Sequence, residues 1–223
     1  MAYILNIETS TKNCSVSVAK DGQTIALNEL NDGSYSHAEK LHEFIRITLE
    51  KASIDFTDLK AIAVSKGPGS YTGLRIGVSA AKGLCYALDL PLISVNTLES
   101  LAHSISIDNG IKIPMLDARR MEVYSAVFNS NNEQLNDVAA TIIDEQSFVE
   151  YIKNNEVYLF GDGAEKCKSI LNNDHFTFIN DKFPSANEMS KLSFDKYKKN
   201  DIEDVAYFEP FYLKEFIALK SSK

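Results

Sequence analysis

The turn Gly67-Pro68-Gly69 is the most specific chemical feature of the sequence. It lies between the apolar segment 61–65 and a helical pattern that begins near Gly73. A glycine turn at the start of a helix can direct backbone N–H groups and the positive helix end toward an anion. The glycine spacing does not fit G-x-G-x-x-G, and no Walker lysine follows. The turn therefore predicts either an anion-binding loop that includes Ser70 or a tight strand-to-helix connection without a ligand.

Two acidic residues end apolar segments at corresponding places in the two halves of the chain. Glu8 precedes Thr9-Ser10, and Asp117 precedes Ala118-Arg119. Across a cleft between related halves, two carboxylates could hold a hydrated Mg²⁺ beside a nucleotide. Alternatively, both acids only cap their own turns by accepting backbone N–H groups. The sequence leaves both interpretations open.

A second glycine turn, Gly161-Asp162-Gly163, follows the apolar segment 157–160 and is the counterpart of the first. These turns and strand ends supply the candidate residues for a nucleotide- or anion-binding loop. The loop would be vestigial if it binds no ligand. The candidate residues are Glu8, Thr9, Ser10, Gly67, Gly69, Ser70, Asp117, Gly161 and Gly163.

No pattern predicts a metal site or a catalytic nucleophile. His37 and His42 are five positions apart, which places them about 140° around a helix and not side by side. The three cysteines form no Cys-x-x-Cys pair. Ser70 lacks the flanking glycines of a G-x-S-x-G elbow. We therefore expect no metal and no catalytic residue in this chain.

Composition excludes several classes of protein. The 223 residues carry a net charge of −8, which argues against unaided binding of a nucleic-acid backbone. The longest run without a charged residue, 123–132, is half the length that a membrane-spanning helix needs. Neither a secretory signal nor a disulfide framework is indicated. These features predict a cytoplasmic protein that makes no contact with a membrane.

The order of elements repeats along the chain. Strands are expected at 2–8, 14–20 and 24–30, followed by a helix at 37–52, a strand at 61–65 and a helix that ends near Leu88. After Asp108-Asn109-Gly110 the same order returns: strands at 113–117, 123–128 and 135–143, a helix at 145–154, a strand at 157–160 and a helix from Ala164. This order predicts an α/β fold of two lobes, 1–107 and 108–223, each βββαβα. The last segment could pack back on the first lobe.

The two helices of the first half have unusual faces. In the helix at 37–52, Phe44 and Ile47 widen the apolar arc beyond what one sheet would cover. This helix is either covered by two layers of its own chain or offered to a partner protein. In the next helix, Gly73, Gly77 and Ala81 recur at four-residue spacing and form a smooth stripe that another backbone could approach closely.

Five segments together resemble the bacterial TsaB (YeaZ) family. They are Ile4–Ser10, Cys14–Val18, Gly67–Gly77, Asp117–Tyr124 and Pro210–Lys214, and they follow the family's order over the whole chain. The resemblance implies the actin-like, sugar-kinase-like ATPase (ASKHA) fold with two lobes of duplicated topology. Glu8 departs from the pattern, since the wider family usually has Asp there, and the extra methylene would move the carboxylate about 1.5 Å outward.

The resemblance also implies a function. Members of this family serve in forming N6-threonylcarbamoyladenosine (t6A) beside the tRNA anticodon, as a non-catalytic scaffold subunit. They pair with the larger catalytic paralogue TsaD and with the ATPase TsaE, and tRNA, ATP and Mg²⁺ are handled through these partners. A homodimer could form when the partner is missing. Hypotheses of other classes are a metal-dependent, protease-like hydrolase and a stand-alone sugar kinase.

In this family the helices of the first lobe form the interface with the paralogue. In this sequence these helices correspond to residues 37–52 and 73–88. The candidate interface residues carried over by the resemblance are Leu41, Phe44, Ile45, Ile47, Gly73, Arg75, Gly77 and Ala81.

Overall fold

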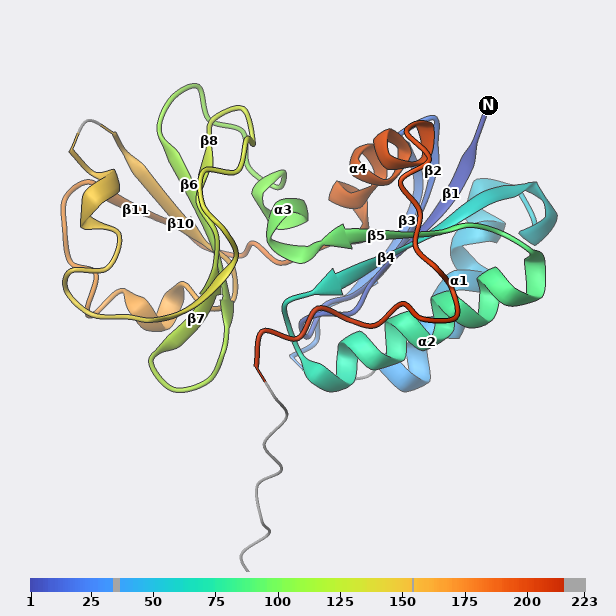
Figure 1. Cartoon of the computed structure of the whole chain (residues 1–223), viewed down its shortest axis with the longest axis horizontal. Helices are drawn as coiled ribbons and strands as arrows, with labels where there is room; N and C mark the ends of the chain where they lie inside the picture. The colour runs from blue at the N-terminus through green and yellow to red at the C-terminus, as the bar shows by residue number, and fades with distance from the viewer. Residues whose placement is uncertain (34–36, 154, 215–223) are drawn as a thin grey trace, which may run out of the picture.

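The computed structural model describes residues 1–33, 37–153 and 155–214. Within these residues the chain forms two lobes, each built on one mixed sheet (Figure 1). None of their helices is long and apolar enough to cross a membrane.

The first sheet has the strand order β3-β2-β1-β4-β5. Its strands are β1 (Tyr3–Glu8), β2 (Cys14–Lys20), β3 (Gln23–Leu30), β4 (Leu59–Gly67) and β5 (Leu92–Asn96). The first three pair antiparallel through short turns, and β4 and β5 add in parallel after helical crossovers. Apolar residues on both faces of β1 and β4 require cover on both sides of this sheet.

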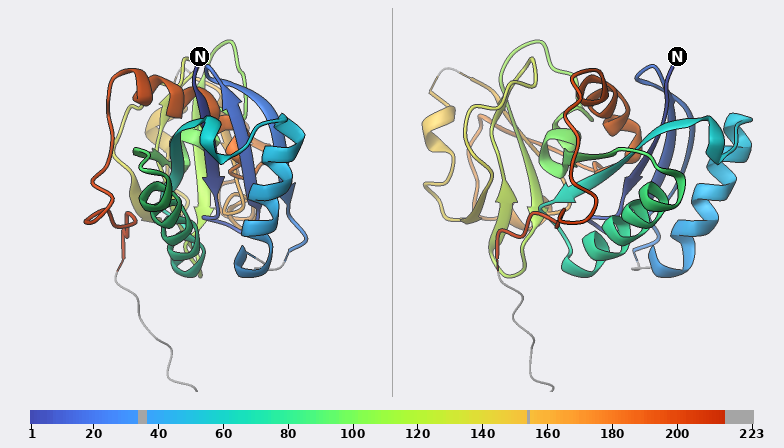
Figure 2. Two further views of the ribbon diagram at one scale, coloured as in Figure 1. Left: turned by 90° about the vertical axis from the view of Figure 1, so that its right-hand side faces the viewer. Right: turned by 45° about the vertical axis from the view of Figure 1, so that its right-hand side comes forward.

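Helices provide that cover. On one face lie α1 (His37–Ala52) and α2 (Tyr71–Leu88), and on the other lies α4 (Ala186–Lys198), as the two views of Figure 2 show. Ser70 caps α2 by accepting the N–H of Gly73, and Ser185 caps α4 by accepting that of Asn187. The short η1 (Phe56–Asp58) precedes β4.

The second sheet has the strand order β9-β7-β6-β10-β11, which places equivalent strands in the same order as in the first sheet. Its strands are β6 (Ile111–Asp117), β7 (Glu122–Ser125), β9 (Ala139–Ile142), β10 (Val157–Phe160) and β11 (Phe176–Ile179), with the short β8 (Phe128–Asn129) beside β6. The strands β6, β7, β9, β10 and β11 occupy the places of β1, β2, β3, β4 and β5. The predicted duplication of the sheets is therefore confirmed.

The prediction of α-helices at 145–154 and from Ala164 in the second half is wrong. Residues 145–153, the described part of the first segment, contain η2 (Val149–Tyr151) and no α-helix, and the turn after Gly163 leads into η3 (Glu165–Cys167). Phe148 has a left-handed backbone, with φ of 65°, which interrupts the first segment. The remaining runs are too short to sustain a helix. The second lobe consequently keeps the repeated strands without the repeated helices.

The short helix α3 (Thr97–Ala102) lies between the lobes (Figure 1). Leu98, Leu101 and Ala102 are buried against Phe128 and Phe160 of the second lobe. The boundary predicted near residue 108 falls in the connection between α3 and β6. Beyond α4, the chain stays on the first lobe for most of its remaining described length.

Candidate functional site

A cleft of about 640 Å³ opens between the lobes. Its walls come from turns that follow β1, β4 and β6, from Tyr124 and Asp162 of the second lobe, and from the C-terminal segment. Its lining residues are Ser10–Lys12, Asn31, Gly33, Pro68–Thr72, Leu116–Arg119, Tyr124, Asp162, Phe183 and Phe211–Lys214.

The glycine turn at 67–69 packs tightly against its own chain. A Cβ at Gly69 would lie 2.5 Å from the carbonyl oxygen of Ser10, and one at Gly67 would lie 2.9 Å from that of Phe211. The Ser70 N–H donates to the Ser10 carbonyl over 2.6 Å. A backbone donor that could face an anion is therefore already used, and packing within the chain accounts for both glycines.

Glu8 is completely buried and does not line the cleft. Its Oε1 accepts the N–H of Ser10 over 2.6 Å, while Oε2 has no hydrogen-bond partner among the described residues. Burial raises the pKa of Glu8 above its usual value, and hydrogen bonds from Ser10 lower it only in part. The side chain therefore lies inside the protein instead of reaching outward, and burial favours its neutral form, a poor ligand for a cation.

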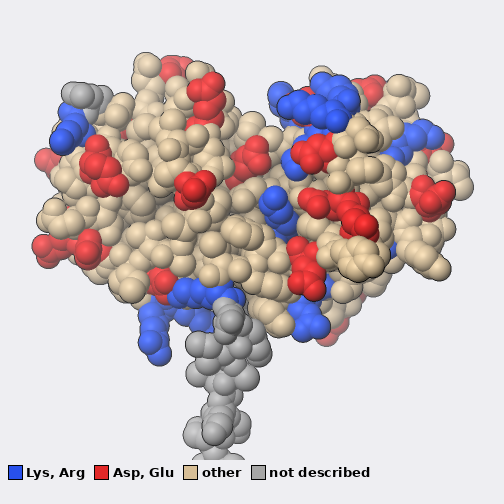
Figure 3. Space-filling model, in the orientation of Figure 1, with Lys and Arg blue, Asp and Glu red and all other residues tan. Residues whose placement is uncertain are grey.

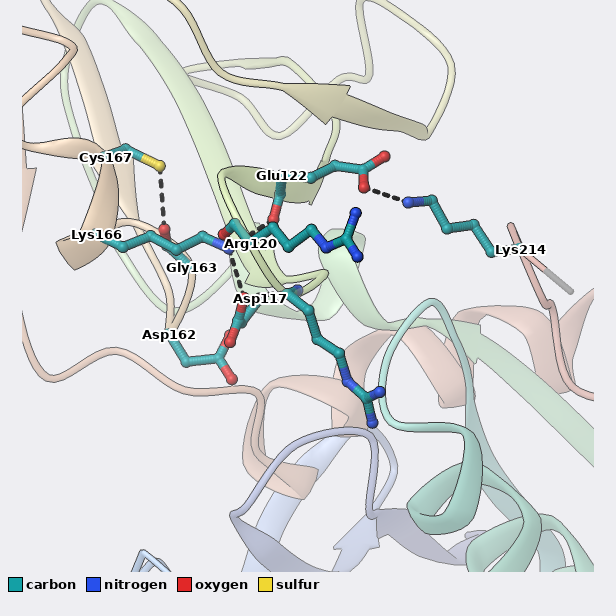
Figure 4. A network of polar contacts seen from close by, with 9 residues as sticks. Asp117, Arg120, Glu122, Asp162, Gly163, Lys166, Cys167 and Lys214 are labelled. Atoms are coloured by element: carbon teal, nitrogen blue, oxygen red, sulfur yellow. Dashed lines mark hydrogen bonds and ion pairs between the residues drawn. The ribbon is translucent and has the colours of Figure 1, made fainter. Parts of the chain in front are cut away.

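Asp117 and Asp162 form a polar network on the second-lobe side of the cleft (Figure 4). The Asp117 carboxylate is 2.5 Å from Lys166 Nζ, and its backbone N–H donates to Asp162 Oδ1 over 3.1 Å. Lys166 also donates to the carbonyls of Arg120 and Glu122. Burial raises the pKa of Asp162 to about 6, and the nearby Asp117 charge adds to this effect. Asp117 is thus held by Lys166 within its own lobe.

The structure brings together only part of the candidate loop. Ser10, Gly69, Ser70 and Asp117 line the cleft, whereas Glu8, Thr9, Gly67, Gly161 and Gly163 do not. Gly161 and Gly163 pack against the backbone of β6, at Met115 and Leu116. No group of three or more acidic, histidine or cysteine side chains in the described part of the chain is arranged to hold a metal ion.

Several cleft residues were missed in the sequence. Asp162 sits between the two glycines of the second turn, and its position there was a signal that could have been used. Lys12 lies in the turn that also holds Ser10. Tyr212 and Lys214 belong to the segment 210–214 that carries the family resemblance, but no pattern placed them at the cleft, because their place depends on the path of the chain after α4.

The stripe of small residues on α2 is filled by Thr9 of the same chain. A Cβ at Gly73 would lie 2.1 Å from the Thr9 carbonyl oxygen, and one at Gly77 would lie 2.2 Å from Thr9 Oγ1. Thr9 Oγ1 donates to the Gly73 carbonyl over 2.8 Å, and Ala81 is buried in the same core. Where another subunit was expected, the structure places the turn after β1.

The apolar arc of α1 is largely covered within the chain as well. Leu41, Phe44 and Ile45 are buried against the first sheet and α2, and Ile47 is half-buried. Of the two interpretations of this helix, cover by its own chain accounts for Phe44. Among the candidate interface residues, Arg75 is exposed.

An open groove remains between α1 and α2. It has a volume of about 720 Å³, and small and aliphatic side chains make up most of its walls. Its lining residues are Ala38, His42, Tyr71, Thr72, Arg75, Ile76, Ser79, Ala80, Gly83 and Leu84. Tyr71 and Thr72 belong to both the groove and the cleft, so the two hollows meet at the start of α2.

Residues 31–215 match the family model of TsaD, tRNA N6-adenosine threonylcarbamoyltransferase. The chain belongs to this family. Within it, the chain is of the TsaB type: TsaB of Escherichia coli K12 is 27% identical over 97% of this chain and 96% of its own length. TsaB of Buchnera aphidicola from Acyrthosiphon pisum is 30% identical over 68% of this chain and 69% of its own.

The fold agrees with this assignment. YeaZ from Pseudomonas aeruginosa superposes with a TM-score of 0.83, at 24% identity, over 96% of this chain and all of that one. The predicted α/β fold of the actin-like, sugar-kinase-like ATPases is confirmed. In this TsaB-family chain Gly69 packs on Ser10, Gly161 and Gly163 pack on β6, and the cleft and the groove are open hollows of the described surface.

Proposed function

We propose that this chain serves in the biosynthesis of threonylcarbamoyladenosine in tRNA, as a scaffold subunit that is not catalytic on its own. The names of its TsaB relatives support the process. The groove between α1 and α2 supports the role of a scaffold subunit, because it is an open and mainly apolar surface. The glycine turns of the candidate anion loop, in contrast, already pack against the chain itself.

The partner of this groove is a TsaD-like paralogue. The family model that matches most of this chain is the one of TsaD, so both subunits share a fold and can form a nearly symmetric helix-to-helix contact. A second copy of this chain could occupy the same groove when the paralogue is missing. A TsaE-like ATPase joins the pair, and ATP and Mg²⁺ act through these partners, with no cofactor held tightly here.

Contact with tRNA is made mainly by the partners. The net charge of −8 opposes strong binding of phosphates. On the face in Figure 3, basic side chains gather in two separate groups, at the top of the right-hand lobe and at the lower end of the junction between the lobes, and acidic side chains lie between and around them.

Reconstitution tests the function. The full chain, the TsaD-like subunit and the TsaE-like ATPase are mixed with tRNA, ATP and threonylcarbamoyl-adenylate, and t6A is measured by mass spectrometry of the nucleosides. We expect t6A only when this chain and the TsaD-like subunit are both present. Formation of t6A by this chain alone, or peptide cleavage by it that chelation abolishes, would contradict a non-catalytic role.

Ser79→Arg is expected to abolish co-elution with the TsaD-like subunit, because Ser79 is an exposed groove residue and a long cation would fill the groove. The thermal stability of the variant should stay close to that of the wild type. Size-exclusion chromatography of the mixture measures the complex.

The matched control for this change is Ser169→Arg, which adds the same side chain at an exposed serine of the second lobe. It should co-elute as the wild type does. If Ser79→Arg also co-elutes fully, the partner does not use the groove, while the t6A assay still decides the function separately.

A further inference from the structure

The described chain after α4 forms a strap, residues 201–214, that runs along the first lobe toward the second (Figures 1 and 2). It begins beside β5, where the Glu203 N–H donates to the Leu92 carbonyl and Ser94 Oγ donates to the Glu203 carboxylate. It then crosses the edge of the sheet to the face of α2. There Lys82 Nζ donates to the carbonyls of Ala206 and Phe208.

The covalent connections between the lobes lie on the opposite side. The chain passes from one sheet to the other at 103–110 and at 180–185, next to α3 and α4. The first connection is fixed by Lys112, a buried lysine whose Nζ donates to the Ile105 carbonyl over 2.8 Å and to Asn132 Oδ1 over 2.7 Å. The lobes are therefore held together on the α3 and α4 side, and any rotation between them would turn about these connections.

The end of the strap closes the other side of the cleft. The Phe211 N–H donates to the Lys66 carbonyl over 2.7 Å, and the ring of Tyr212 lies 4.9 Å from that of Tyr71 at the start of α2. Lys214 then forms an ion pair with Glu122 of β7, in the second lobe. All four residues from Phe211 to Lys214 line the cleft.

We propose that the strap is a clamp that sets the opening of the cleft. The strap contacts the first lobe at Tyr71, through Tyr212, and the second lobe at Glu122, through Lys214. With the covalent connections on one side of the lobes and a bridge on the other, rotation that widens the cleft must break the Lys214–Glu122 pair or lift Tyr212 from Tyr71. Both contacts are partly exposed, so they can open and close without unfolding either lobe.

All contacts of the clamp lie within one chain, so its test does not depend on any partner. Distances between nitroxide labels at Glu39→Cys on α1 and Ser169→Cys in the second lobe are measured by pulsed electron spin resonance. The native Cys14, Cys85 and Cys167 are all buried, which directs the labels to the introduced sites.

Lys214→Glu, Glu122→Lys and Tyr212→Ala should each broaden the distance distribution relative to the wild type. The double exchange Lys214→Glu with Glu122→Lys should restore a narrow one, because the ion pair forms again with reversed charges. Tyr207→Ala is the matched control, since Tyr207 lies on the strap and is 84% exposed. It should leave the distribution unchanged.

Lys214 and Tyr212 are exposed and the Glu122 side chain is 18% exposed, and circular dichroism and melting temperature verify that each variant is folded. An unchanged distribution in Lys214→Glu and in Tyr212→Ala would overturn the clamp. So would failure of the charge exchange to restore the wild-type distribution after both single reversals had broadened it.

Discussion

Gly77→Ala should destabilise the protein by about 1–3 kcal/mol, although alanine is the better helix former. The new Cβ would lie 2.2 Å from Thr9 Oγ1, and a hydrogen bond to the Gly73 carbonyl holds this hydroxyl in place. Gly73→Ala should cost at least as much, because its Cβ would lie 2.1 Å from the Thr9 backbone carbonyl. Urea unfolding followed by circular dichroism measures both.

Thr9→Ala separates the two sites. It removes the hydroxyl that blocks Gly77, so the double variant Thr9→Ala with Gly77→Ala should be nearly as stable as Thr9→Ala alone. It leaves the carbonyl that blocks Gly73, so no such recovery is expected for Gly73→Ala.

Gly83→Ala is the control on the same helix. A Cβ there meets nothing within 4 Å, so the change should stabilise the protein by up to about 1 kcal/mol. If Gly77→Ala behaves like Gly83→Ala, the contact between Thr9 and α2 is not as tight as the structure shows.

This contact also changes which variants can test partner binding. A leucine at position 77 or an aspartate at position 44 would disrupt the core of the first lobe, since both positions are buried. Loss of association in such variants would report unfolding. The exposed residues of the groove, such as Ser79 and Arg75, are the ones that can report the interface.

Periodicity in the sequence predicted most strands of the two sheets but missed β11 (Phe176–Ile179) at the edge of the second. The strands at the centre of each lobe are short, continuous apolar runs bounded by turns, and such runs keep their conformation because both faces are covered. The second-lobe helices were predicted wrongly because the repeat was extended from strands to their connections. A connection is under weaker constraint: 3₁₀ turns at Val149–Tyr151 and Glu165–Cys167 suffice to cover that sheet.

The candidate site was only partly accessible from the sequence. The glycine turns mark positions where a backbone approaches closely, and that inference needs no knowledge of the approaching group. Which group it is depends on the fold: Ser10 meets Gly69 and Thr9 meets Gly73 because β1 and β4 are neighbours. The contact of Tyr212 with Tyr71 joins segments far apart in sequence, and no local pattern indicates it.

Asp162→Asn is expected to stabilise the protein above about pH 6. In the folded state burial raises the pKa of Asp162 from 3.8 to about 6, so the folded state binds this proton more tightly than the unfolded chain does. Its contribution to stability is present below pH 3.8 and is lost as the pH rises toward 6. The difference in pKa, at about 1.36 kcal/mol per unit, limits the gain from the neutral amide to about 3 kcal/mol at pH 8.

The amide oxygen of the variant can still accept the Asp117 N–H, so the turn keeps its geometry. Free energies of unfolding in urea are compared at pH 4 and pH 8, and the advantage of Asp162→Asn should be confined to the higher pH. Asp137→Asn, at an exposed aspartate of the same lobe, is the control and should show no such pH-dependent gain. An equal effect of Asp162→Asn at both pH values would mean that burial beside Asp117 does not raise the pKa of Asp162.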